Sequence, residues 1–354
     1  MNRTSDPTPG SAVTALEIVL PGIVEPEGLQ LRHRVLPALA DAEVLVDVEA
    51  TGVSFAEQAM RRGKYYGQPA FPFVPGYDLV GTVSAVGPGV DADLLGRRVA
   101  ALTKTGGWAS HAVLAARDVV LVPEGLDPAE VETLVVNGIT AWQMLHRRAK
   151  VRPGQTILVH GASGGVGTTL VQLARHHGVH VIGTASPRHH QALRELGVTP
   201  VDYRDPDLAA RVRELAPAGV DAVFDHLGGD SVPRSYGLLA PGGTLVCYAI
   251  ATKLNDTGGG SLLWPFLTLM TQLAWWNWLP NGFSASFYNI WSGHGLRPRA
   301  FQKRLRQDLT TGLELLADGV LKPQIAARLP LAQAREAMEM AGSHTAYGKI
   351  ILIP

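Results

Sequence analysis

The chain of 354 residues has one cysteine, Cys247, and no excess of either charge. A lone cysteine cannot form a disulfide within the chain, so nothing indicates an oxidising compartment, and we expect a cytoplasmic protein. Lys and Arg together number 31, as do Asp and Glu together, so no net field attracts nucleic acid or an acidic membrane. We therefore expect a small molecule as the substrate and neither a nucleic acid nor a membrane as the partner.

Long apolar runs are also scarce. The first 15 residues are polar and lack the apolar core of a signal peptide, so we expect a loose extension there. Residues 262–279 carry no charge, but Pro265 and several polar side chains interrupt the run, and no transmembrane helix is expected. We expect instead a helix and loop buried at a subunit interface or over a substrate pocket. Four tryptophans would line such a pocket or serve plain packing: Trp264, Trp275, Trp276 and Trp278.

Two hydrophobic patterns divide the chain. Up to about residue 136, apolar and polar residues alternate as in half-buried strands, for example over 43–49, with Gly and Pro between the runs. Beyond residue 138, short apolar strands such as 156–160 alternate with helices, which predicts a doubly wound parallel sheet. The last strand, 349–353, is expected to return to the first domain. We predict an α/β protein of two domains. The β-rich catalytic domain comprises residues 1–137 and 298–354, and the nucleotide-binding domain comprises residues 138–297.

The strongest local signal is the stretch His-Gly-Ala-Ser-Gly-Gly-Val-Gly over 160–167. It lies between an expected strand and an expected helix, the context that a dinucleotide fingerprint requires. Gly164 would let the backbone approach a pyrophosphate, and Gly167 would let the helix pack closely on the sheet. The helix N-terminus would add N–H donors and a positive dipole end. The turn residues assigned to the cofactor are Ser163, Gly164, Gly165, Val166 and Gly167.

The same stretch has a competing interpretation. Gly-Ala-Ser-Gly-Gly over 161–165 also fits the G-x-S-x-G elbow of hydrolases, with Ser163 as the nucleophile. Asp225 and His226 would then be its partners. Adjacent residues of a strand point to opposite faces, so these two do not easily serve one site, and the dinucleotide interpretation is favoured.

The end of the next expected strand decides between NADH and NADPH. An NAD site usually has Asp or Glu there for the ribose 2′-hydroxyl, whereas residues 183–190 contain no acid. Arg188 can pair with a 2′-phosphate and Ser186 can donate to it, with His190 as a weaker candidate. The sequence therefore favours NADPH, although a solvated helix start would also explain Arg188.

Zinc ligands are scarce as well. Cys247 has no partner cysteine, and the histidine pairs at 176–177 and 189–190 suit solvated helix surfaces better than a metal site. We therefore expect no metal ion. Without a Lewis acid, a conjugated carbonyl compound is the better acceptor. Its β-carbon takes hydride, while its oxygen needs only a hydrogen-bond donor and a later proton.

Several segments resemble the medium-chain dehydrogenase/reductase superfamily, in particular its zinc-free quinone oxidoreductase and enoyl reductase branch. They span nearly the whole chain and include 51–57, 73–81 and 137–142. Tyr77-Asp78 stands where zinc enzymes of the family carry ligands, and Ser54 stands near the place of a ligand cysteine. The resemblance implies a GroES-like domain beside a Rossmann domain, and a homodimer. It adds three residues to the cofactor site: Thr140, Tyr203 and Gly228.

Quinone reductases commonly have Asn and Asp where this chain has Ser54 and Glu57, so a quinone and an enone both stay open. Tyr65 is the leading expected donor to a developing enolate oxygen, with Ser54 second and Tyr77 a further candidate. We predict a zinc-independent, NADPH-dependent reductase of a quinone or an α,β-unsaturated carbonyl compound. The alternative is an NADPH-binding family member with lost or altered redox chemistry, as a sensor or a non-redox biosynthetic enzyme.

Overall fold

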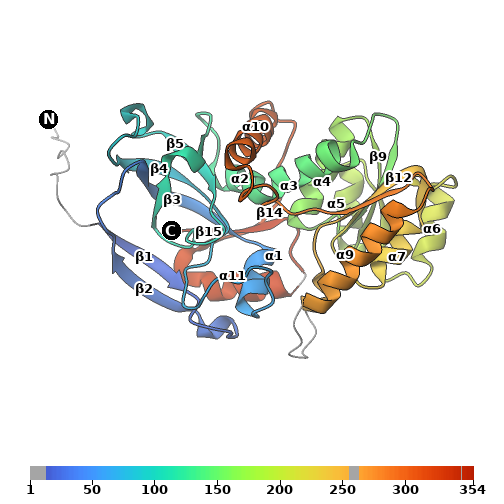
Figure 1. Ribbon diagram of the computed structural model, residues 1–354, viewed down its shortest axis with the longest axis horizontal. Helices are drawn as coiled ribbons and strands as arrows, with labels where there is room; N and C mark the ends of the chain where they lie inside the picture. Colours follow the sequence, from blue (N-terminus) through green and yellow to red (C-terminus); the bar gives the residue numbers. More distant parts are fainter. Residues whose placement is uncertain (1–12, 255–262, 344) are drawn as a thin grey trace.

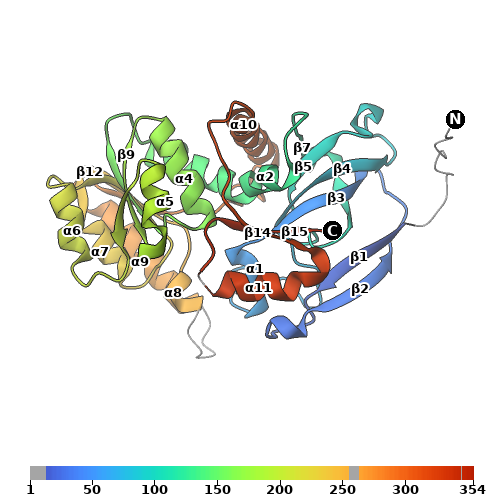
Figure 2. The same ribbon diagram turned by 180° about the vertical axis from the view of Figure 1, so that it is seen from behind.

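The computed structural model describes residues 13–254, 263–343 and 345–354. Most of the N-terminal extension and Leu262 therefore lie outside the described residues. Two large sheets form the two ends of the molecule (Figure 1), and the view from behind shows the same division (Figure 2). Three helices lie between them: α2 (Pro128–Thr133), α3 (Ile139–Trp142) and α10 (Pro298–Ala317).

The first large sheet has seven strands, in the order β14–β15–β3–β4–β5–β7, with β6 paired to β3. The strands are β3 (Glu43–Val53), β4 (Asp78–Val86), β5 (Arg98–Leu102), β6 (His111–Ala115), β7 (Val119–Leu121), β14 (Ile325–Pro330) and β15 (Lys349–Ile353). A separate pair, β1 (Thr14–Val19) and β2 (Gln30–Val35), and the helices α1 (Phe55–Arg61) and α11 (Ala334–Gly342) complete this half. The last strand, β15, pairs antiparallel with β3, which confirms its expected return to the first sheet.

The second sheet has six strands, and all neighbouring pairs are parallel. The strands in spatial order are β10 (Thr199–Asp202), β9 (His180–Ala185), β8 (Thr156–His160), β11 (Val220–Asp225), β12 (Leu239–Cys247) and β13 (Ser284–Phe287). In chain order this is 3-2-1-4-5-6, the order of a dinucleotide-binding Rossmann sheet, so the predicted fold class is confirmed. The helices of this half are α4 (Gly165–His176), α5 (His190–Glu195), α6 (Leu208–Leu215), α7 (Ser231–Tyr236), α8 (Ala251–Leu254) and α9 (Leu263–Trp278).

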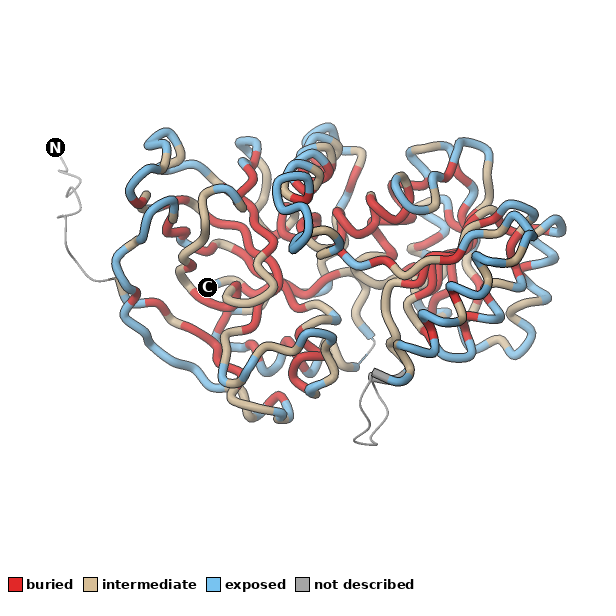
Figure 3. Tube along the Cα trace, in the orientation of Figure 1, coloured by how far each residue is buried: buried red, intermediate tan, exposed pale blue. Residues whose placement is uncertain are grey.

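Buried residues follow the strands of both sheets and continue through the helices between them (Figure 3). Phe301 and Leu305 of α10 belong to one apolar cluster with Leu102 and Val120 of the first sheet. The same cluster includes Ile157 of the Rossmann sheet. Helix α10 therefore helps to join the two halves through a continuous core.

Helix α9 covers the apolar stretch that was expected either at a subunit interface or over a substrate pocket. Trp264, Trp275 and Trp278 are 74%, 57% and 76% exposed, so these tryptophans do not line a pocket within the chain. Trp276 alone of the four packs inward, with its ring stacked on Tyr236 at 4.0 Å between centroids. Among the described residues, no helix is both long and apolar enough to cross a membrane.

Candidate functional site

The residues expected to bind a cofactor gather at the carboxyl edge of the Rossmann sheet. The glycine-rich turn follows β8, and the neighbouring strands β9 and β11 lie on opposite sides of β8. This is the switch point at which open α/β sheets bind ligands. The residues that follow the four strands are 163–167 after β8, Ser186, Arg188 and His190 after β9, Tyr203 after β10, and Gly228 after β11. Thr140 lies apart from them on α3, where it is buried.

The three turn glycines assigned to the cofactor, Gly164, Gly165 and Gly167, have different surroundings. A Cβ on Gly167 would lie 2.2 Å from the carbonyl oxygen of Gly161, so only glycine lets α4 start this close to β8. A Cβ on Gly165 would lie 2.5 Å from Nδ2 of Asn137. Around Gly164 the nearest atom to such a Cβ is 3.4 Å away, an ordinary contact. The space over Gly164 is therefore open, as the approach of a pyrophosphate requires.

Asp225 does not serve as the acid of a hydrolase triad. Its Oδ2 accepts hydrogen bonds from the hydroxyls of Ser231 and Ser235 at 2.7 and 2.8 Å. Its Oδ1 accepts from the backbone N–H groups of residues 227 and 228 at 2.8 and 3.1 Å. Despite burial, the nearby His160, followed by the hydrogen bonds, holds the pKa of this carboxyl below its usual value. Both oxygens are occupied in shaping the loop after β11, which argues against Ser163 as a nucleophile.

The edge beyond β9 carries two guanidinium groups. Nε of Arg188 donates to Oγ of Ser186 at 3.2 Å, and Arg188 is exposed. Nε of Arg204 donates to the hydroxyl of Tyr203 at 2.8 Å, and its guanidinium lies 5.1 Å from the centre of that ring. Nε2 of His190 lies 3.2 Å from the carbonyl oxygen of residue 185 and so faces the backbone. Arg188 and Arg204 are thus the groups near which the 2′-phosphate of a bound NADPH would lie.

Tyr65, Tyr77 and Trp291 form a chain of hydrogen bonds in the β-rich half. The hydroxyls of Tyr65 and Tyr77 lie 2.5 Å apart, and Nε1 of Trp291 donates to the Tyr77 hydroxyl. Tyr77 is 4% exposed, whereas Tyr65 is only partly buried. Burial raises the pKa of both phenols, so both keep their protons at neutral pH. The structure therefore brings together two of the three residues expected to be catalytic.

Ser54, the third of them, begins helix α1. Its hydroxyl accepts from the N–H of Ala56 at 3.1 Å and donates to Oε2 of Glu57, while Oε2 also accepts from the N–H of Ser54 at 2.8 Å. The other oxygen of Glu57 accepts from the N–H of Tyr77 at 2.7 Å. Burial, followed by the charge of Asp78, raises the pKa of Glu57. Ser54 thus caps a helix and fixes Glu57, which in turn positions the backbone of Tyr77.

Asp78 follows Tyr77 in the sequence, but its side chain belongs to a separate buried ion network. Nζ of Lys349 contacts Oδ2 of Asp78 at 2.6 Å and Oε1 of Glu132 at 2.7 Å. All three side chains are at most 2% exposed. Burial, and then the nearby Asp78 carboxylate, raises the pKa of Glu132 well above its usual value. Asp78 therefore ties β4 to α2 and β15, and we assign it to the fold rather than to catalysis.

Gly348, next to Lys349, touches the glycine-rich turn. Its N–H donates to the carbonyl oxygen of Ser163 at 3.0 Å, and it forms a parallel bridge with Gly164. The strand that follows, β15, belongs to the first sheet. The turn of one half is therefore held against the chain entering the other half.

The part of the chain that the structure describes holds no cluster of three or more His, Cys, Asp or Glu residues able to bind a metal ion. The β-rich half, joined to a Rossmann sheet with a glycine-rich turn at its switch point, defines a two-domain dehydrogenase or reductase scaffold. Models of two domain families match the chain: the alcohol dehydrogenase GroES-like domain at 40–124 and zinc-binding dehydrogenase at 196–352.

Known proteins extend the match to almost the whole chain. The synaptic vesicle membrane protein VAT-1 homolog of Rattus norvegicus is 35% identical over 92% of this chain and 80% of its own length. A quinone oxidoreductase of Pseudomonas syringae superimposes with a TM-score of 0.81 at 27% identity, over 96% of this chain and all of its own. A mycobacterial protein in complex with NADPH superimposes with a TM-score of 0.79 at 27% identity, over 96% of this chain and 100% of its own. The chain therefore belongs to the medium-chain dehydrogenase/reductase superfamily, in the branch of quinone oxidoreductases and enoyl reductases.

Sequence reasoning missed three parts of this region. The Ser54-x-x-Glu57 spacing is a capping-box signature that was available in the sequence. Trp291 carried no such signal, because it lies 214 residues from Tyr77. Lys349 and Glu132 were also missed, since their pairing depends on strands and helices brought together by the fold.

Proposed function

We propose that the protein is an NADPH-dependent reductase that passes hydride to a quinone or to an α,β-unsaturated carbonyl compound. The observation that carries this proposal is the open glycine-rich turn at the switch point, beside an edge with Arg188 and Ser186 and no carboxylate in 183–190. A pyrophosphate fits over Gly164, and a 2′-phosphate fits the guanidinium edge. The NADPH complex of the mycobacterial relative and the name of the Pseudomonas relative support the same cofactor and reaction class.

When bound, NADPH supplies the hydride, and the chain supplies position and a hydrogen bond. The Trp291 N–H fills one acceptor position of the Tyr77 oxygen, and we assign the Tyr77 proton to the hydrogen bond with Tyr65, a direction that the geometry permits. The Tyr65 proton is then directed away from Tyr77, on the less buried side of the pair. There it stabilises the negative charge that develops on the acceptor oxygen during hydride transfer. Solvent supplies the final proton to carbon.

The direct test is a fluorescence titration with NADPH and NADH, followed by absorbance loss of NADPH with a panel of quinones and enones. We expect tighter binding of NADPH than of NADH and turnover of at least one acceptor class. Failure of both nucleotides to bind would overturn the proposal.

Replacing Arg188 by alanine is expected to weaken NADPH binding by about 10- to 100-fold, because a charge-assisted hydrogen bond contributes roughly 1.5–3 kcal/mol. NADH lacks the 2′-phosphate, so its affinity should stay within about twofold. Both constants are measured by the same titration. Arg194→Ala, an exposed change on the neighbouring helix α5, is the control and should alter neither constant. An equal loss for both nucleotides would show that Arg188 does not contact the 2′-phosphate.

Replacing Tyr65 by phenylalanine is expected to lower kcat about 10- to 100-fold with little change in the Kd of NADPH. The change removes one hydrogen bond to developing charge and keeps the ring that packs against Tyr77 at 6.1 Å. Stopped-flow kinetics under single turnover isolates the hydride step. Tyr66→Phe is the matched control, since Tyr66 is 71% exposed and stacks on Phe266. Unchanged single-turnover rates in Tyr65→Phe would assign the donor role elsewhere.

A second candidate is a family member with altered redox chemistry. The observation in its favour is a structural relative named as a cyclopropanase of curacin A biosynthesis, with a TM-score of 0.81 at 27% identity. Ser54, where quinone reductases commonly have Asn, fits this candidate as well. NADPH binding without turnover of any quinone or enone would favour it.

We also propose that the protein is a cytoplasmic homodimer. Strand β13 is the edge of the Rossmann sheet, and helix α9 beside it exposes three tryptophans. An open strand edge next to a large apolar surface suits pairing with a second copy.

A further inference from the structure

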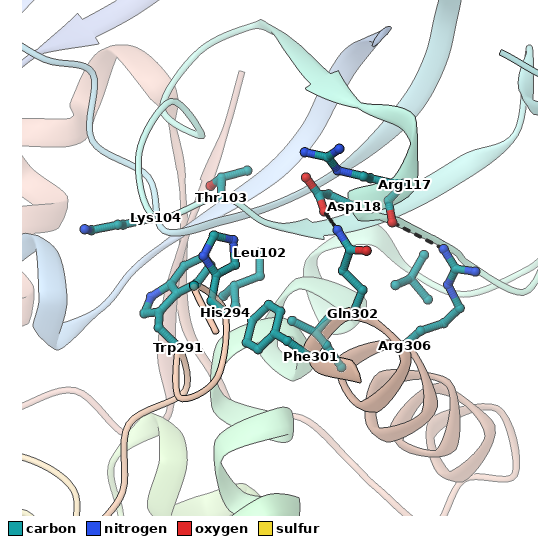
Figure 4. A pocket seen from close by; sticks show the side chains of 13 residues that line it. Leu102, Thr103, Lys104, Arg117, Asp118, Trp291, His294, Phe301, Gln302 and Arg306 are labelled. Atoms are coloured by element: carbon teal, nitrogen blue, oxygen red, sulfur yellow. Dashed lines mark hydrogen bonds between the residues drawn. The ribbon is translucent and has the colours of Figure 1, made fainter. Parts of the chain in front are cut away.

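A cavity of about 420 Å³ lies where the first turns of α10 face the first sheet (Figure 4). Its walls come from the end of β5, from the chain around β7, and from residues 291–306, as the labelled side chains show. Its volume falls within the range of about 300–1,000 Å³ that is usual for pockets binding small molecules. None of the residues assigned above to the cofactor lines it.

The floor of this pocket is apolar. Leu102, Val120, Phe301 and Leu305 are between 3% and 7% exposed, and all four line the cavity. They belong to the continuous core, so the floor is held rigidly by packing. A hydrocarbon or aromatic body is the kind of group that gains free energy by covering such a floor.

The rim of the pocket is cationic. Lys104, Arg117 and Arg306 line it, and within the described part of the chain none of them forms an ion pair with a carboxylate. Asp118 is the acidic side chain among the lining residues, and its Oδ1 accepts a hydrogen bond from Nε2 of Gln302 at 2.7 Å. Nη2 of Arg306 donates to the backbone carbonyl oxygen of Arg117 at 3.3 Å, while the Arg117 side chain extends away from Arg306 along the rim (Figure 4). Three cationic side chains around one opening favour a carboxylate or a phosphate as the ligand.

The pocket adjoins the chain of hydrogen bonds formed by Tyr65, Tyr77 and Trp291. Trp291 lines the pocket, and its Nε1 donates to the hydroxyl of Tyr77. Lys104 also lines it, and its Nζ lies 5.9 Å from the centre of the Tyr65 ring. A molecule with one end in the pocket therefore has its other end close to the group expected to contact the reacting oxygen.

We propose that this pocket binds the anionic end of the acceptor, so that the substrate is an amphipathic organic anion: a carboxylate or phosphate joined through an apolar body to the conjugated carbonyl. The inference rests on the proposed function and names its substrate class. The apolar floor holds the body, the cationic rim holds the charge, and Trp291 separates this subsite from Tyr77.

The test compares two straight-chain enones that differ only at the far end, one a carboxylate and the other its methyl ester. The wild-type protein should use the carboxylate with a kcat/KM about 10- to 100-fold above that of the ester, mostly through KM, since hydrogen bonds to a charged group contribute about this much. In Arg117→Glu/Arg306→Glu the ratio of the two kcat/KM values should fall to about one or reverse. Both arginines are exposed, so the double change leaves the core intact.

Lys303→Glu is the control, because it reverses one positive charge on the exposed face of α10 outside the pocket. It should keep the preference for the carboxylate. Equal use of the two enones by the wild-type protein, or a preference that survives the double change, would overturn the proposal.

Calorimetry with the saturated carboxylate of the same chain length separates this proposal from the proposed function. Binding that is lost in the double variant supports the anion subsite even where no enone is reduced, an outcome that would count against the reductase alone. Absence of saturable binding to the wild-type protein would contradict the subsite even where the ester is reduced.

Discussion

Replacement of Lys349 by methionine is expected to lower the free energy of unfolding by about 3–5 kcal/mol at pH 7.5, the usual cost of removing one partner of a buried ion pair. Lys349 contacts Asp78 and Glu132 at 2.6 and 2.7 Å, and the three groups are almost fully buried. Methionine fills similar space but leaves two carboxyl groups with no cation. Urea denaturation followed by circular dichroism measures the change.

The pH dependence of this loss has a defined sign. Burial and the Asp78 charge raise the pKa of Glu132 above its usual 4.5, whereas Lys349 lowers it. Without Lys349 the pKa of Glu132 rises further, so the folded variant binds more protons than its unfolded chain above pH 4.5. Its stability therefore falls as pH rises through that window and recovers as pH falls towards 4.5. The difference between variant and wild type should shrink between pH 7.5 and pH 5.

Two further variants make the interpretation specific. Lys322→Met removes an exposed lysine and should cost less than about 0.5 kcal/mol. Lys349→Met/Glu132→Gln should be more stable than Lys349→Met at pH 7.5, because one buried acid is replaced by a neutral amide. A loss in Lys349→Met that is independent of pH and unrelieved by Glu132→Gln would show that packing, not charge, is responsible.

The Rossmann half was predictable because its signals are local. Strands β8 and β11 occupy the segments expected from their apolar runs, since a strand buried on both faces needs a continuous hydrophobic segment. The glycine-rich turn sits between β8 and α4 because Gly167 has no Cβ to clash with Gly161. Each of these features depends on residues within about ten positions of one another.

Features that join distant segments were not predictable in the same way. Trp291 meets Tyr77 across 214 positions, and Lys349 meets Asp78 across 271. No periodicity encodes such pairs, because they depend on how whole elements pack. The orientation of helix α9 was not predictable for another reason: its uncharged residues are apolar on nearly every face, so the pattern does not say which tryptophans face solvent.

Two glycine-to-alanine changes in the turn should both weaken NADPH binding, but only one of them should lower the free energy of unfolding. In Gly167→Ala the new Cβ would lie 2.2 Å from the carbonyl oxygen of Gly161 and 2.9 Å from backbone atoms of Ala162. These backbone atoms cannot yield as a flexible side chain does, so α4 must move away from β8. We expect a loss of about 3 kcal/mol or more in the free energy of unfolding, together with loss of NADPH binding.

In Gly164→Ala the new Cβ meets its nearest atom at 3.4 Å, and the backbone there has φ −81°, which alanine adopts readily. Its unfolding free energy should therefore stay within about 0.5 kcal/mol of the wild type. The methyl group would occupy the space that a pyrophosphate needs, so NADPH affinity should still fall by at least about tenfold. Urea denaturation gives the unfolding free energy of each variant, and fluorescence titration gives the Kd of each for NADPH. Unchanged NADPH affinity in a stable Gly164→Ala variant would mean that the pyrophosphate does not lie over this turn, and the cofactor site would have to be sought elsewhere.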